Sequence, residues 1–170
     1  MALPNALKNF NHYNDGNSLM GVVEEVTLPK LSRKMEEFQG GGMVAPVDID
    51  LGNEKLEHEV TLGGFAGEVV KQFAATKANA VLHRFAGGYQ RDDTSDVQAV
   101  EIVTRGRYQE IDFGNAKVGD KSQTKLKGSL SYYKLTVDGV VLIEIDALSF
   151  VYMVNGVDML AAQRKAIGLA

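Results

Sequence analysis

Alternation of apolar and polar residues runs through most of this chain and predicts β-strands. In segment 55–62 one set of residues is mostly apolar and the other acidic or polar: Leu56, His58, Val60 and Leu62 against Glu57, Glu59 and Thr61. Successive side chains of a strand point to opposite faces, so one face of this segment should be buried and the other solvated. Segment 124–137 shows the same period, with Leu126, Gly128, Leu130 and Tyr132 against Lys125, Lys127, Ser129 and Ser131.

Further strands are expected where β-formers gather between turn residues. They cover residues 18–28, 31–38, 44–51, 80–89, 97–111, 140–145 and 149–154. Asp138-Gly139 predicts a tight hairpin. Gly52-Asn53 predicts a turn that pairs the strands on either side of it.

The segment 65–76 changes period and predicts a helix. Phe65, Val69 and Phe73 recur at every fourth residue, which is typical of an amphipathic helix.

A second helix is expected at the end of the chain. Asp158 is a suitable N-cap, the helix should run to about Ala166, and Gly168 should end it.

The elements together predict one mainly β domain over residues 1–170, with two helices, in the α+β class and of barrel or sandwich type. A sheet of this size leaves edge strands with unpaired backbone groups. Extending the sheet across subunits until it closes is one way to pair them. The sequence permits that solution and also permits a monomeric sandwich.

Composition narrows the function. Cysteine is absent, so neither a disulfide nor a thiolate metal site is possible. The net charge of −4, from 22 acidic and 18 basic residues, argues against a protein that grips the phosphate backbone. The chain has no apolar stretch of the ~20 residues that span a bilayer, so no membrane insertion is expected.

The sequence shows no set of residues whose spacing predicts a catalytic or metal site. His12, His58 and His83 fall in separate segments with no metal-binding spacing, and they are expected far apart, on the surface or half-buried. No nucleophile elbow or phosphate-binding loop stands at a strand-to-helix junction. We therefore expect no enzyme and no catalytic, cofactor-binding or metal residue.

A family resemblance rests on nine short segments. In order they are TLPKL (27–31), GMVAPVDIDLG (42–52), TLGGF (61–65), RFAGGYQRDD (84–93), RGRYQEID (105–112), SYYKLTVDG (131–139), IEID (143–146), VNGVDML (154–160) and IGL (167–169). This collinear series resembles the major tail tube protein of contractile-tailed bacteriophages, whose relatives include the tubes of R-type pyocins.

The resemblance implies a structural protein without cofactors. Its homohexameric rings would stack into a hollow cylinder whose inner wall is one β-barrel closed between subunits. DNA would pass through the lumen during ejection, without specific binding. The implied partners are the tail sheath, tape-measure, baseplate and tail-terminator proteins. The implied location is the virion tail, after assembly in the host cytoplasm.

The resemblance also implies roles for three groups of residues. The ring-stacking loop would be Gln39, Gly40, Gly41, Gly42, Met43, Val44 and Ala45. The lumen-facing candidates are Glu57, Glu59, Thr61, Lys125, Lys127, Ser129 and Ser131. The candidates for sheath or neighbour contact are Glu68, Lys71 and Gln72. The lysines either pair with acids of the next subunit, or their strand faces outward.

Two alternatives remain open at this point. The inner tube of a type VI secretion system shares the expected fold, although APVDIDLG, GGYQRDD and VNGVD favour the phage protein. A monomeric β-barrel that binds a ligand would need an aromatic-lined pocket, yet the chain has no Trp and its six Tyr are dispersed.

Overall fold

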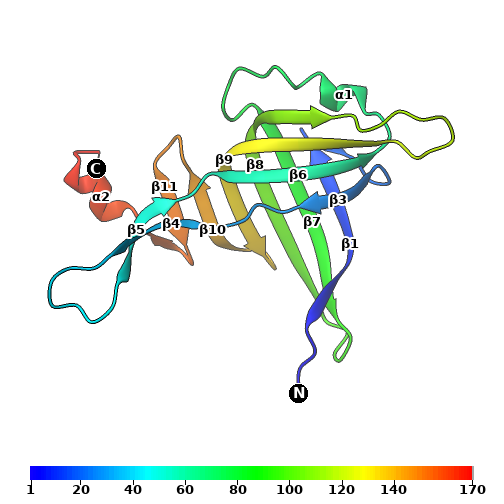
Figure 1. The fold of residues 1–170 in the computed structure, drawn as a ribbon. Coiled ribbons are helices and arrows are strands. Elements are labelled where there is room, and N and C mark those ends of the chain that lie inside the picture. Colours follow the sequence, from blue (N-terminus) through cyan, green and yellow to red (C-terminus); the bar gives the residue numbers. More distant parts are fainter. Residues whose placement is uncertain (170) are drawn as a thin grey trace.

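The computed structural model describes residues 1–169, and Ala170, the last residue of the predicted domain, lies outside them (Figure 1). The strands are β1 (Asn5–Asn14), β2 (Asn17–Ser18), β3 (Val23–Thr27), β4 (Arg33–Phe38), β5 (Val47–Asn53), β6 (Leu56–Gly63), β7 (Val81–Arg91), β8 (Val97–Asp112), β9 (Gln123–Val137), β10 (Val140–Asp146), β11 (Val151–Val154) and β12 (Val157–Asp158). The helices are α1 (Gly67–Val70) and α2 (Ala161–Ala166). The predicted mainly β fold with two helices is confirmed.

Ten strands form one antiparallel sheet, in the order β12-β11-β10-β9-β8-β7-β1-β2, with β6 attached to β9 and β3 to β6. Strand β9 makes this branching possible. Residues 123–130 of β9 pair with β6, residues 132–137 pair with β10, and the other edge pairs with β8. Strands β4 and β5 form a separate two-stranded sheet that projects from the body (Figure 1).

The sheet curls so that β3 and β6 face β1 and β7 across an apolar core. Val60, Leu62 and Leu126 are completely buried in the first core cluster, together with Val81 of β7. A second cluster is built around Phe85, Ile102, Tyr133 and other residues nearer β10. The predicted apolar face of 55–62 is therefore the face that is buried.

The predicted helix over 65–76 is wrong in extent, because α1 has only four residues and turns follow it. Of the three residues in the predicted stripe, only Val69 is buried. Phe73 is exposed, and Phe65 stacks on Phe113 of the neighbouring loop at 5.4 Å between ring centroids. The spacing is helical, but neither phenyl ring of the stripe faces the core.

The terminal helix begins later than predicted, at Ala161, with Leu160 at its N-cap. Asp158 instead closes the preceding turn, where its carboxylate accepts from the Leu160 N–H at 3.0 Å and pairs with Arg164. Gly168, with φ of 78°, follows the helix and supplies the predicted left-handed stop.

The turn predicted at Gly52-Asn53 is also wrong. Both residues belong to β5, which pairs with β4 and not with β6. The chain continues from β5 into β6, and the Glu54 N–H donates to the Ser32 carbonyl at 2.8 Å. Gly52, with φ of 112°, lies in a register shift of the hairpin, so its conformational freedom serves a bulge.

Tyr132 was predicted on the buried face of β9, but Tyr133 is the buried residue. The register between β8 and β9 shifts between Arg105 and Gly106, which leaves Ser131 as an extra residue. A bulge of this kind changes the phase of every side chain that follows it.

Strand β1 was not predicted. It pairs antiparallel with β7 over most of its length, although its sequence, NALKNFNHYN, is rich in Asn, which is depleted in strands.

The expectation for the histidines is wrong as well. His12, His58 and His83 meet inside the sandwich and are 2%, 5% and 3% exposed. The antiparallel pairing of β1 with β7, and the packing of β6 across from them, brings the three distant segments together.

Candidate assembly surfaces

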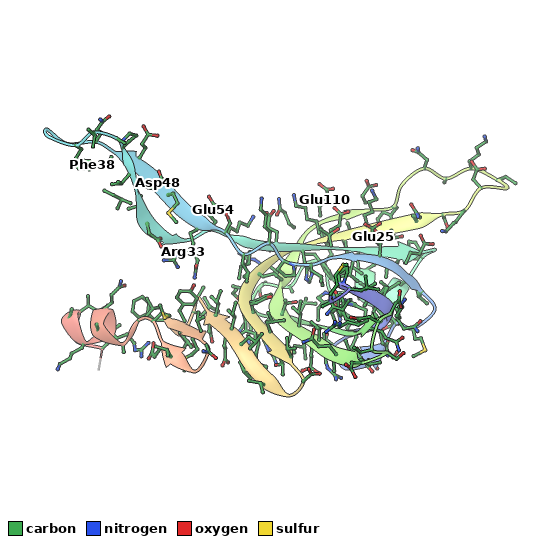
Figure 2. The ribbon with its side chains drawn as sticks, turned by 90° about the horizontal axis from the view of Figure 1, so that it is seen from below. Glu25, Arg33, Phe38, Asp48, Glu54 and Glu110 are labelled. Atoms are coloured by element: carbon green, nitrogen blue, oxygen red, sulfur yellow. The ribbon has the colours of Figure 1, made fainter. Side chains whose placement is uncertain are left out.

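Strands β3, β6, β9 and β8 form one layer of the molecule, and one face of this layer is continuously polar. Glu59 is directly opposite Lys127, and Lys127 is opposite Glu110. Residues opposite each other in a ladder share a face, so the suggestion that the lysine strand faces the other way from the glutamate strand is wrong. The polar face comprises Glu25, Thr27, Glu57, Glu59, Arg107, Glu110, Asp112, Lys125, Lys127 and Ser129. Figure 2 shows Glu25 and Glu110 along this layer.

The polar face carries more negative than positive charge, since its five carboxylates outnumber its three cations. Two lysines form ion pairs with Glu57 within the chain. Glu57 lies 2.8 Å from Lys55 and 3.9 Å from Lys127, and the hydrogen bond from Lys55 lowers the pKa of Glu57. Even with Lys55 counted, the five carboxylates outnumber the cations of the face.

Two of the seven predicted lumen residues are buried, although Thr61 lies opposite Glu25 and Lys125 of the polar face. Thr61 is 7% exposed and Ser131 is 9% exposed. The Ser131 hydroxyl donates to the carbonyl of Ala78 at 3.2 Å. The lumen-facing role of the remaining five residues stays a prediction.

The layer ends in two open strand edges. Strand β3 pairs only with β6, so its other edge is free among the described residues. Strand β8 pairs with β7 only as far as Gly106, so residues 107–112 have one free edge. Open edges present N–H and C=O groups that readily pair with another chain.

The hairpin β4–β5 projects from the body with both faces solvated (Figure 2). One face carries Phe38, Val47 and Ile49, each 45–52% exposed, with Glu36 opposite Ile49. The other face carries Glu37, Asp48 and Asp50. A two-stranded hairpin is at best marginally stable alone, and clustered exposed apolar side chains are typical of a protein contact.

Arg33 holds the root of the hairpin. Its guanidinium lies 2.7 Å from Asp50 and donates to the Asn53 side chain at 2.7 Å. It also lies over the ring of Tyr152 at 5.4 Å, which joins the hairpin to β11. The hydrogen bond from Arg33 lowers the pKa of Asp50.

The predicted ring-stacking residues, Gln39 to Ala45, form the tip of this hairpin. The Gln39 side-chain amide donates to the Met43 carbonyl at 3.2 Å, and the Met43 N–H donates to the Gly40 carbonyl at 3.2 Å. These bonds close the glycine-rich turn, while Val44 is fully exposed at its end.

The predicted sheath-contact residues do not all face solvent. Glu68 and Lys71 are exposed and form an ion pair at 2.6 Å. Gln72 turns inward, where its amide donates to Asn14 at 2.9 Å and to Asp15 at 2.7 Å.

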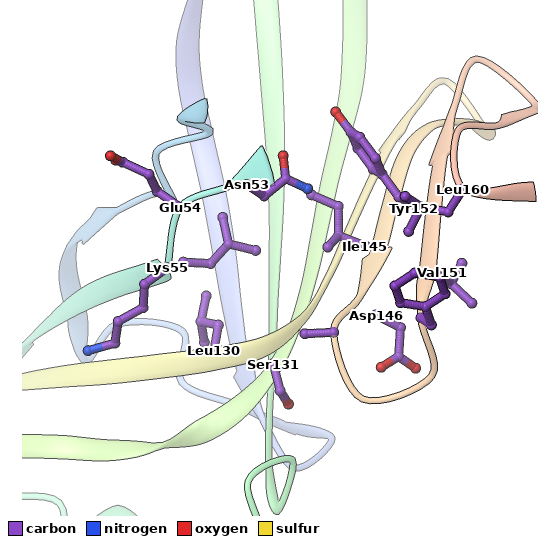
Figure 3. A pocket seen from close by; sticks show the side chains of 13 residues that line it. Asn53, Glu54, Lys55, Leu130, Ser131, Ile145, Asp146, Val151, Tyr152 and Leu160 are labelled. Carbon is purple, nitrogen blue, oxygen red and sulfur yellow. The ribbon is translucent and has the colours of Figure 1, made fainter. Parts of the chain in front are cut away.

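A cleft of about 250 Å³ lies between the hairpin root and strands β10 and β11 (Figure 3). Its lining is mainly apolar and includes Leu56, Ile145 and Tyr152. The Asp146 carboxylate accepts from two N–H groups of the following turn, at 3.0 and 3.1 Å, and so is already committed. The cleft therefore offers few free polar groups to orient a small ligand.

Over residues 1–169 no three or more His, Cys, Asp or Glu side chains are arranged to hold a metal ion. Neither α1 nor α2 has the length and apolar character that crossing a membrane would require.

Two phage proteins are similar to this chain along nearly its whole length. The tail tube protein of Escherichia phage P2 is 48% identical over 172 residues, covering 99% of this chain and all of the P2 protein. The major tail tube protein of Serratia phage KSP20 is 39% identical over 158 residues, covering 92% of this chain and 91% of that protein.

Solved structures show the same fold at low identity. A chain of the sheath-tube complex of an extracellular contractile injection system has a TM-score of 0.58 at 11% identity, covering 78% of this chain and 91% of that one. The sheath/tube terminator of the same kind of system also gives 0.58, at 10% identity, covering 77% and 95%. The model of the family phage tail tube protein FII matches residues 4–168. This chain belongs to the phage tail tube protein FII family.

Proposed function

We propose that this structural subunit of the phage tail tube forms hexameric rings that stack into a hollow cylinder through which DNA passes during ejection. The observation that carries the proposal is a four-stranded layer with a polar face and an open edge on each side. Its relatives are tail tube proteins.

Ring closure would join β3 of one subunit to residues 107–112 of β8 in the next. Strands β3, β6, β9 and β8 alternate in direction. A neighbouring β8 beside β3 would therefore continue the antiparallel alternation across the seam. Each contact between subunits would pair backbone N–H and C=O groups that the edge strands of the single chain leave unpaired. A head-to-tail contact of this kind gives a closed ring when its rotation closes.

The polar face would line the lumen, with Glu57, Glu59, Lys125, Lys127 and Ser129 at its centre. Its excess of carboxylates would repel DNA phosphates and keep the DNA mobile. The pair of Lys127 with Glu57 does not change this excess.

The β4–β5 hairpin would make the contact between stacked rings. Its tip, Gln39 to Ala45, would meet the neighbouring ring, and its apolar face would be covered there. Burial of that face would stabilise a hairpin that has little support in the isolated subunit.

The remaining surface would serve the other tail components. Glu68 and Lys71 are candidates for contact with the sheath or with a neighbouring subunit. The tube would enclose the tape-measure protein before ejection and end at the baseplate and the tail terminator. Assembly would take place in the host cytoplasm, and the product is part of the virion tail.

The test is negative-stain microscopy of the purified subunit at rising concentration, with and without baseplates as nuclei. Wild-type protein should give open-ended tubes of uniform diameter. Replacing two residues of the hairpin's apolar face (Phe38→Ser with Ile49→Ser) should leave the fold intact and abolish long tubes. The control, Val140→Ser, changes a residue that is 60% exposed outside the hairpin. A wild-type subunit that stays monomeric even with baseplates would refute the proposal.

A further inference from the structure

The inner space between the two layers contains a polar cluster that the tube function does not use. It consists of His12 on β1, His83 on β7 and His58 on β6, all nearly fully buried. His12 Nε2 lies 2.9 Å from His83 Nδ1, and His83 Nε2 lies 3.1 Å from the Tyr108 hydroxyl. The rings of His58 and His83 meet edge to face, with centroids 4.7 Å apart.

The hydrogen bond between His12 and His83 requires that at least one of the two imidazoles is neutral. A bond between two imidazole nitrogens needs a proton on one of them and a lone pair on the other. If both rings were protonated, His12 Nε2 and His83 Nδ1 would be two donors facing each other. His58 stands against the same His83 ring, so a charge on it would repel a charge on either partner.

No carboxylate among the described residues forms a hydrogen bond with any of the three rings. The nearby groups are hydroxyls and amides: Thr104 lies 3.4 Å from His58 Nδ1, while Asn14 and Gln72 bond to the Tyr108 hydroxyl. Within the hydrogen-bonded network a carboxylate is reached at Asp15, beyond Gln72. Glu57, Glu59 and Lys127 line a cleft that also touches His58. The other side chains around the rings are apolar and come from β3, β7, β8 and the segment after β3: Val26, Leu28, Pro29, Phe85 and Ile102.

Burial therefore opposes protonation of all three rings. Desolvation lowers the pKa of His12 to about 4. Desolvation, with the charge of His12 as a second cause, lowers the pKa of His58 to about 4. The pKa of His83 is lowered well below its usual value, first by desolvation and then by its two neighbours.

We propose that the three-histidine cluster is an acid-sensitive lock, which joins the β6 layer to the β1–β7 layer while its imidazoles are neutral and releases them when they are protonated. The layer that carries the polar face would then part from the layer behind it. The proposal rests on the fold of one subunit and does not depend on how subunits assemble.

The direction of the pH dependence follows from the lowered pKa values. The unfolded chain takes up a proton at each histidine near pH 6.5, whereas the folded chain does so only near pH 4. Stability is therefore fully present above pH 6.5 and falls as the pH drops from 6.5 toward 4. Between pH 7.5 and 5.5 the unfolding equilibrium constant should rise about tenfold for each of His12 and His58, and His83 acts in the same direction.

The experiment benefits from a chain with only three histidines, all in the cluster. Imidazole nitrogen NMR signals of the folded protein should show neutral rings from pH 8 to pH 5.5. Urea unfolding at pH 7.5 and 5.5 should show at least a hundredfold rise in the unfolding constant. Paired carboxylates contribute little above pH 5.5, because their usual pKa lies near 4.

Variants assign the effect to the cluster. In His58→Gln and in His12→Gln, the rise in the unfolding constant between pH 7.5 and 5.5 should be about tenfold smaller than in the wild-type protein. If either variant fails to fold, the wild-type protein alone decides, through the protons taken up on unfolding. Calorimetry in two buffers at pH 5.5 should find about two to three protons, against fewer than one at pH 7.5. An imidazole that titrates near pH 6.5 in the folded protein, or an uptake below one proton at pH 5.5, would overturn the proposal.

Discussion

Replacement of Gly106 by alanine should be among the most destabilising small changes in this subunit. Gly106 lies in β8 at the register shift against β9. A methyl group there would overlap the carbonyl oxygen of Ser129 and lie 2.9 Å from the Cα of Leu130. Both neighbours are backbone atoms of the central strand, so neither can rotate away as a flexible side chain would.

The magnitude follows from these contacts. Overpacking a well-packed site costs about 1–3 kcal/mol, and occasionally more. Because relief here requires the β8–β9 ladder to shift, we expect the upper end, about 3 kcal/mol. In a chain of this size that lowers Tm by about 6–12 °C, at about 2–4 °C per kcal/mol. The ladder shift would also disturb the bulge that places Tyr133 in the core.

Urea unfolding of the Gly106→Ala variant, compared with that of the Gly41→Ala variant, measures this effect. The Gly41 change is chemically the same, but an added methyl there meets nothing within 4 Å. The control should lie within about 0.5 kcal/mol of the wild-type protein. If the two variants had equal unfolding midpoints, the bulge would not have the role assigned to it.

Three further predictions concern the core, the hairpin root and the polar face. Leu126→Ala, at a completely buried site, should cost about 3–5 kcal/mol in urea unfolding, while Leu148→Ala, at a residue 60% exposed, should change stability by less than about 0.5 kcal/mol. Arg33→Ala should cost less than about 1 kcal/mol, yet it should speed amide exchange in the hairpin and shorten the tubes seen by microscopy. Glu59→Lys with Glu110→Lys should leave tube assembly intact but slow genome ejection from phage particles, and added salt should restore the rate; an unchanged rate at low salt would contradict a lumen role.

Local patterns predicted much of the sheet. Strict alternation at 55–62 placed Leu56, Val60 and Leu62 in the core, where they are found. The hairpin signal Asp138-Gly139 lies between β9 and β10, with positive φ at both residues. These features depend on neighbours in sequence, so the sequence alone contains the information.

The errors arise where long-range contacts decide. The stripe Phe65, Val69, Phe73 has helical spacing, but Phe65 finds an aromatic partner in Phe113 outside the core. Gly52-Asn53 has turn chemistry, but the preceding strand pairs with β4 and continues past it. A bulge at Ser131 cannot be recognised from alternation alone, because the register is set by Gly106 on another strand.

The histidine cluster shows the same limit. His58 and His83 each occupy a core-facing position in an alternating segment, which was a usable signal that both are buried. Their meeting with His12 was not predictable, since it depends on β1, a strand whose composition is poor in β-formers.

Family membership settles the main functional alternatives. The match to the tail tube protein FII family and two tail tube relatives confirm the predicted resemblance and a structural role instead of an enzymatic one. They also favour the phage tube over a type VI secretion tube and over a monomeric ligand-binding barrel.

A cryo-electron microscopy reconstruction of the assembled tube would test the central claim most directly. We predict a hollow cylinder whose inner wall shows Glu59 and Lys127, with β3 of one subunit beside residues 107–112 of the next. A wall in which this polar face points outward, or is buried between subunits, would contradict the account.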